Sequence, residues 1–316
     1  MENASSGSKP SSLQQFYLLA VRLLTPLHIG AGEGESEVDK PVIKDIFGLP
    51  YIPASSLKGA IKRLPYFYYL KNNTIYSIFG SSPNVNPSVA VVGLLDAIPL
   101  CFLARELEKV YCYVSFLPHF LHFLDYCRIA GLLSEQELNK LVIPNRGKPL
   151  VFPESEFIGR NEIIINERKF GKPEQLKDWD KVQELLRKIG KIFGLEDFVK
   201  RFVVLPETPE AVAALRSSCI IYTRNSLELL VKQVRSGLLW SEEYVPYNSI
   251  FVSVVILERQ RLGAVLEKIS ENDIKNELEK QFNELEKKLR NSEPVYLFLG
   301  GLESIGKGFA EIRSIK

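Results

Sequence analysis

The sequence lacks the features that would assign it to a membrane, secreted or zinc-binding class. No apolar run is long enough to cross a bilayer, and no basic stretch followed by an apolar segment opens the chain. The four cysteines (101, 112, 127 and 219) include no Cys-x-x-Cys pair, which argues against a zinc knuckle and a disulfide framework. We therefore predict a soluble, cytoplasmic protein with reduced thiols and no membrane partner.

A strong charge of one sign is also lacking. The formal net charge is only +2, so any RNA-binding surface must be a local cluster of basic residues. The chain has 316 residues, of which 46% are hydrophobic and 25% charged, as in ordinary globular proteins. This length is sufficient for one large domain or two modest ones with a buried core.

Hydrophobic patterning predicts interleaved strands and helices. Residues 1–15 are Ser-rich and predict a flexible tail, whereas the apolar run Phe16–Leu24 predicts a central strand buried on both faces. Further strands are expected at 42–46, 50–52, 89–95, 110–116, 219–223, 250–257, 295–299 and 309–312, and a hairpin or extended arm at 162–170. Helices are expected at 55–64, 120–133, 134–141, 177–193 and 265–290.

This order of elements favours an α+β fold. We predict an RRM-like, that is ferredoxin-like, core with a glycine-rich loop and large helical and hairpin insertions. Residues 16–316 would then form a single domain, with the insertions at about 65–215.

The first candidate site is the segment from His28 to Lys62. Glycines at 30, 32 and 34 allow the backbone to approach a ligand closely, although a tight turn explains them equally well. The helix expected to begin at a Ser55 or Ser56 cap would present free N–H groups to a phosphate. The residues predicted to contact an RNA backbone here are Ser55, Ser56, Lys58, Lys62 and Arg63. The alternative is a solvated helix face.

The second candidate site is the glycine-rich loop at 300–308. Its amide groups, with the side chain of Lys307, would form a nest for a nucleic-acid backbone, and Gly306 and Gly308 flank that lysine. It is not a Walker loop, because Gly308 rather than Ser or Thr follows Lys307 and a strand follows the loop. Binding of a nucleoside triphosphate is therefore not expected.

Asp39 is the third candidate. Its carboxylate, just after the first glycines, could hold a divalent ion such as Mg²⁺ or Mn²⁺, or take a proton from a ribose 2′-hydroxyl. A surface turn residue is the plainer explanation. His28 could act as acid, base or phosphate contact, or be a structural hydrogen-bonding residue. His119 and His122 lack further ligands at metal-binding spacing, which favours a structural role.

Five segments carry a resemblance to a known family. Residues 25–32, 38–43 (Val-Asp-Lys-Pro-Val-Ile) and 48–59 together resemble the N-terminal signature of the RAMP superfamily of CRISPR proteins. Residues 300–309 are similar to that superfamily's glycine-rich loop, and 237–246 to the Cmr backbone subunit of type III-B complexes. The stretch from about 65 to 215 resembles nothing recognised in the family. Glu33, Glu35 and Glu37 make the first loop more acidic than the family pattern implies.

The resemblance implies a function. It implies a subunit that binds guide RNA in several stacked copies beside other Cmr subunits, and cleaves paired target RNA at regular intervals as a divalent-metal-dependent endoribonuclease. Asp39 falls on the family's catalytic aspartate, which would also bind the metal, and His28, Glu242 and Tyr244 fall on positions near it. Three alternatives remain open: a non-catalytic RNA-binding subunit, a type III-A Csm-like backbone subunit, and a guide-processing endoribonuclease of the same superfamily.

Overall fold

The computed structural model describes residues 14–32, 38–64, 78–80, 90–227 and 234–316. Most of the predicted tail (1–13), the acidic loop at 33–37 and parts of the predicted insertion (65–77 and 81–89) lie outside the described residues. No helix in the described ranges has the length and apolar content to cross a membrane.

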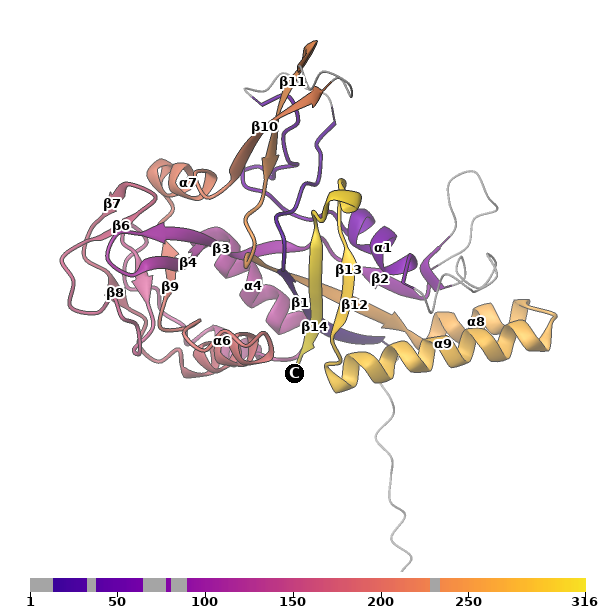
Figure 1. The fold of residues 1–316 in the computed structure, drawn as a ribbon. Helices are drawn as coiled ribbons and strands as arrows, with labels where there is room; N and C mark the ends of the chain where they lie inside the picture. Colours follow the sequence, from indigo (N-terminus) through magenta and orange to yellow (C-terminus); the bar gives the residue numbers. More distant parts are fainter. Residues whose placement is uncertain (1–13, 33–37, 65–77, 81–89, 228–233) are drawn as a thin grey trace, which may run out of the picture.

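A large mixed sheet of twelve strands organises the molecule (Figure 1). Its main path runs β13-β14-β1-β12-β3-β4-β9-β5-β8. The strand predicted at 16–24 is confirmed as β1 (Gln14–Leu23), which starts two residues earlier and lies between β12 (Ile250–Glu258) and β14 (Phe309–Ile315), antiparallel to both. The other strands of the path are β13 (Val295–Phe298), β3 (Ile98–Glu106), β4 (Val110–Phe116), β9 (Phe202–Leu205), β5 (Leu150–Val151) and β8 (Glu174–Gln175). Off the path, β2 (Val92–Leu94) pairs with β12, and β6 (Ile163–Ile165) pairs with β3 and β7 (Arg168–Phe170).

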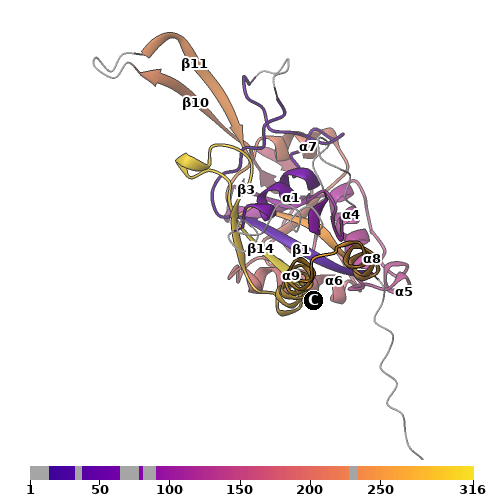
Figure 2. The same cartoon turned by 90° about the vertical axis from the view of Figure 1, so that its right-hand side faces the viewer.

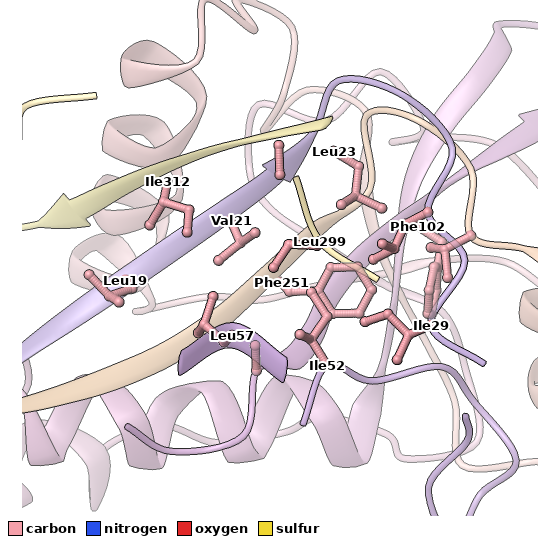
Figure 3. Packing of buried hydrophobic residues seen from close by; sticks show 14 of the residues in the cluster. Leu19, Val21, Leu23, Ile29, Ile52, Leu57, Phe102, Phe251, Leu299 and Ile312 are labelled. Carbon is pink, nitrogen blue, oxygen red and sulfur yellow. The ribbon is translucent and has the colours of Figure 1, made fainter. Parts of the chain in front are cut away.

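Two apolar clusters cover the two faces of this sheet. Side chains alternate along β1, so that Leu19 and Val21 join one cluster and Leu18 and Ala20 the other. Helices α1 (Ala54–Lys62), α7 (Pro209–Arg216), α8 (Arg259–Lys268) and α9 (Asn272–Asn291) contribute to the first cluster, part of which is shown in Figure 3. Helices α4 (Leu117–Ile129) and α6 (Asp180–Ile192) contribute to the second. Ser134 caps the short α5 (Glu135–Leu138) through a capping box with Glu137.

The single helix predicted at 265–290 is wrong. The chain forms α8 and α9 there, and Figures 1 and 2 show them side by side, projecting past the sheet. Ile269 ends α8 with an extended backbone (φ −84°, ψ 127°). Apolar residues recur at helical spacing on both sides of this break, because both helices contribute to the same cluster, and the sequence pattern therefore hides the break.

A second, two-stranded sheet stands apart from the large one. Strands β10 (Ile220–Leu227) and β11 (Val234–Tyr244) form a hairpin that projects from the body of the protein (Figures 1 and 2). Thr223 pairs with Ser241, and Tyr222 with Glu242. The base of this hairpin holds the candidate site.

Candidate catalytic site and nucleic-acid interface

The two distant candidate segments lie against each other. The Gly301 N–H donates to the His28 carbonyl oxygen at 2.9 Å, and the Gly308 N–H donates to the Pro26 carbonyl oxygen at 2.9 Å. Gly300 has a φ of 70°, and a Cβ there would clash with the same His28 oxygen. Glycine is therefore required for this close approach.

Asp39 is attached to the hairpin by its backbone neighbours and by its own side chain. The Lys40 N–H donates to the Ser241 carbonyl oxygen, and the Glu243 N–H donates to the Lys40 carbonyl oxygen, both at 3.0 Å. Asp39 Oδ2 accepts from the Ser241 N–H at 2.7 Å and from its hydroxyl at 2.8 Å. These hydrogen bonds lower the pKa of the exposed Asp39 carboxyl, which is therefore ionised at neutral pH.

Glu242, two strand positions before Tyr244, is the centre of a buried polar network. Its side chain is 1% exposed and accepts from Trp240 Nε1 at 2.7 Å, Arg224 Nε at 2.9 Å, Lys40 Nζ at 3.3 Å and the hydroxyl of Tyr244. Burial alone would raise the pKa of Glu242, but these donors and the charge of Arg224 outweigh it and lower the pKa to about 2. Glu242 thus stays charged and anchors the surrounding side chains.

His28 and Lys307 both lie near the ring of Tyr244, which belongs to this network. His28 Nδ1 lies 2.8 Å from the Glu243 carbonyl oxygen. Because a carbonyl only accepts, His28 Nδ1 is the donor in this contact. The His28 ring is buried with its centroid 5.6 Å from that of Tyr244, and Lys307 Nζ lies 5.1 Å from the Tyr244 ring centre and 4.9 Å from that of Tyr222. The structure thus brings together five predicted site residues, namely His28, Asp39, Glu242, Tyr244 and Lys307.

The predicted serine cap of α1 is wrong. The helix starts at Ala54 after Pro53, with no side-chain cap from its own N-terminal residue. Asp96, from the segment between β2 and β3, instead accepts from the Ala54 N–H at 2.7 Å, so a residue distant in sequence supplies the acceptor. Ser55 and Ser56 lie in the first turn, and Ser55 is exposed.

The basic residues of α1 face different surroundings. Arg63 is exposed, and its Nη1 lies 3.8 Å from a Glu303 carboxylate oxygen, next to the glycine-rich loop. Lys62 Nζ instead donates to the Gly80 carbonyl oxygen at 3.2 Å and lies 5.9 Å from the centre of the Phe79 ring. Lys58 is half-buried on the same helix. Of these three residues, Arg63 is the one that forms an ion pair with the loop at 300–308.

The described residues contain no group of three or more His, Cys, Asp or Glu side chains arranged to hold a metal ion. His119 Nε2 lies 2.6 Å from Asp45 Oδ2, and the His122 ring lies 4.6 Å from that of Tyr126. Both histidines therefore have the structural contacts that the sequence favoured for them.

Sequence reasoning missed two residues of the site. Ser241 contacts Asp39, and Arg224 contacts both Glu242 and Tyr244. Ser241 is 202 positions away from Asp39, and Arg224 is 18 positions away from Glu242. The polar residues of β10 and β11 stand in consecutive runs and do not alternate with apolar ones, so no local pattern drew attention to these two residues.

Comparison with known proteins gives one family throughout. The family model of the RAMP superfamily matches residues 20–311. The CRISPR system Cmr endoribonuclease Cmr4 of Pyrococcus furiosus is 27% identical over 94% of both chains, and the CMR subunit Cmr4 of Saccharolobus solfataricus is 28% identical over 93% of this chain and 94% of that one. A chain in the cryo-EM structure of type III-B Cmr-beta bound to cognate target RNA superposes with a TM-score of 0.70, at 26% identity over 95% of this chain and 96% of that one. Because the family model spans nearly the whole sequence, this chain belongs to the RAMP superfamily.

Proposed function

We propose that this protein is a backbone subunit of a type III-B CRISPR effector complex, which binds guide RNA in several stacked copies, assembles with other Cmr subunits in the cytoplasm and cleaves the paired target RNA. The observation that carries the proposal is the match to a Cmr endoribonuclease along 94% of the chain, together with an exposed, ionised Asp39 held against the hairpin by Ser241. The Cmr names of both relatives favour this assignment over a type III-A Csm-like subunit.

The central strands support an RRM-like core for this function. Strands β14, β1, β12 and β3 are adjacent in that order, and each neighbouring pair is antiparallel. Helix α1 connects the first of them along the chain to the second, and α8 and α9 connect the third to the last. This is the β-α-β-β-α-β order of a ferredoxin-like unit. The hairpin and the strands beyond β3 are then additions to that unit.

For cleavage, we propose that Asp39 acts on a ribose of the target strand. Ser241 occupies Oδ2, and the carboxylate is exposed, so Oδ1 is the oxygen assigned to receive the proton of the 2′-hydroxyl. The 2′-oxygen bonds to the adjacent phosphorus, the P–O5′ bond breaks, and the leaving O5′ takes a proton from water. The products are a 2′,3′-cyclic phosphate and a 5′-hydroxyl. Holding the ribose in line for this attack would supply much of the rate.

A divalent ion at this site would need RNA phosphates and water to complete its coordination. Magnesium commonly binds proteins through one or two carboxylates and completes its coordination with water and substrate phosphates. Within the described residues Asp39 offers such a carboxylate, without a cluster of further ligands. We propose that Asp39 holds Mg²⁺ or Mn²⁺, which would supply charge neutralisation at the phosphate.

The other site residues take supporting roles in the proposal. Glu242, whose pKa of about 2 prevents it from acting as an acid at neutral pH, holds Arg224 and Tyr244 in place. His28 connects the hairpin to the first loop through the Glu243 carbonyl. The residues proposed to contact the guide backbone are Ser55, Ser56, Lys58, Arg63, Gly306, Lys307 and Gly308. Lys62 is better explained as a contact that fixes α1 to residues 79–80.

The test is target cleavage by a reconstituted complex carrying Asp39→Ala. We expect assembly and target binding to persist while cleavage stops, and wild-type products should end in cyclic phosphate. Cleavage at the wild-type rate would refute Asp39 as the catalytic group and favour a structural RNA-binding subunit. Cleavage of precursor guide RNA by the isolated subunit in the presence of chelator would instead favour a guide-processing enzyme.

A further inference from the structure

We propose that Ser241 is a positioning residue for cleavage, and that through Ser241 the hairpin β10–β11 sets the orientation of the Asp39 carboxylate. This inference rests on the function proposed above, and it adds a residue to which neither the sequence pattern nor the relatives' names assign a role.

Ser241 contacts Asp39 through its main-chain N–H and through its hydroxyl. Its N–H donates to Asp39 Oδ2 at 2.7 Å, and its hydroxyl donates to the same oxygen at 2.8 Å. The hydroxyl oxygen in turn accepts from the Asp39 N–H at 3.0 Å. A hydroxyl has one hydrogen and two lone pairs, so both contacts can form at once. One serine therefore fixes both the main chain and the carboxylate of Asp39.

This arrangement matters because Asp39 is exposed. A solvent-exposed aspartate without such partners samples several rotamers, and each productive encounter with a ribose would first have to select one of them. Two donors on a single oxygen select one orientation in advance and leave the second oxygen for the substrate. Groups held in reactive geometry by neighbouring hydrogen bonds react faster for this reason.

The hairpin, rather than the large sheet, supplies these contacts. Ser241 lies on β11 opposite Thr223 of β10, in the two-stranded sheet that is separate from the large one. The residues after Asp39 also contact β11. Lys40 forms a parallel bridge with Glu242, and the Val42 N–H donates to Glu243 Oε2 at 3.1 Å. A movement of the hairpin would therefore carry Asp39 with it. A base pair or strand that displaced the hairpin would change the position of the reacting carboxylate.

The experiment compares Ser241→Ala and Ser241→Thr with wild type in the assembled complex, in single-turnover cleavage at saturating complex. Ser217→Ala is the matched control, because Ser217 is an exposed serine that follows α7 directly and whose hydroxyl donates to the Ala213 carbonyl oxygen. We expect Ser241→Ala to lower the cleavage rate constant roughly 10- to 100-fold while target affinity and thermal unfolding stay unchanged. Threonine, which keeps the hydroxyl, should restore most of the rate.

Asp39→Ala, measured in parallel, separates this inference from the proposed function. If Asp39→Ala abolishes cleavage and Ser241→Ala cuts at the wild-type rate, the positioning role is overturned and the proposed function stands. A loss in Ser241→Ala that appears in target affinity or unfolding, and that threonine does not rescue, would also overturn it, because the role would then be structural. Cleavage by Asp39→Ala at the wild-type rate would refute both.

Discussion

Replacing Glu242 by glutamine tests the buried network at the base of the hairpin. Glutamine keeps the shape of the side chain but resembles the protonated acid, so the substitution removes the charge from a group that is 1% exposed. The folded protein lowers the pKa of Glu242 from 4.5 to about 2. At 1.36 kcal/mol for each pKa unit, this preference for the ionised form corresponds to roughly 3 kcal/mol. We therefore expect Glu242→Gln to lower the free energy of unfolding by about that amount at pH 7.

The sign of the pH dependence follows from the same values. A carboxyl whose pKa is depressed by folding stabilises the native state above its unfolded pKa, and this contribution disappears as the pH falls through the folded pKa. For Glu242 it should be complete near pH 7 and be lost between about pH 5 and pH 2. The difference between wild type and Glu242→Gln should thus shrink as the medium becomes acidic.

The assay is urea unfolding at several pH values, followed by circular dichroism and by the fluorescence of Trp240, which contacts Glu242. The matched control is Glu207→Gln, because Glu207 forms an exposed ion pair with Arg146 at 3.5 Å. Exposed pairs contribute about 0–1 kcal/mol, so this variant should unfold almost as wild type does. Equal stability of wild type and Glu242→Gln at pH 7, or a difference that stays constant into acid, would refute the reasoning.

Three further predictions each test the contacts of a single residue. Gly300→Ala should destabilise the protein by about 1–3 kcal/mol, because its φ of 70° disfavours a side chain and a Cβ would meet a carbonyl oxygen. Gly301→Ala, where a Cβ meets no atom within 4 Å, is its control, and urea unfolding compares them. His119→Ala should lower the free energy of unfolding by about 1–3 kcal/mol, since it leaves the Asp45 carboxylate without its 2.6 Å partner; equal urea midpoints would contradict this. Lys307→Gln should weaken guide-RNA binding for all sequences alike and reduce the slope of log K against log salt by about 1 in titrations at several salt concentrations.

Parts of the fold were predictable because local pattern and tertiary structure agree. The nearly continuous apolar run at 16–24 becomes β1, which is covered on both faces, and Ser134 caps its helix through a glutamate three residues later. Strand β9 and helix α7 were missed, because their short apolar runs carry too little periodicity to separate them from loops. The cap of α1 was mispredicted for a different reason. Ser55 and Ser56 are residue types that commonly cap helices, but in the structure Asp96, which is distant in sequence, accepts the hydrogen bond from the first N–H of α1.

The candidate site likewise contains some residues that the sequence could identify and others whose roles depend on tertiary contacts. Positions that require glycine are visible in a sequence, because few other residues tolerate a close backbone approach, and this made the loops near Gly30 and Gly300 recognisable. Asp39 was a candidate from its place after the first glycines, and the family resemblance gave it a catalytic role and added Glu242. The partners that give these carboxylates their properties, Ser241 and Arg224, are an ordinary serine and arginine on a hairpin. Their roles depend on how β11 pairs with residues 38–42, and that pairing leaves no periodic signal in either segment. The residues that hold a reactive group in place are thus harder to read from sequence than the loop that carries it.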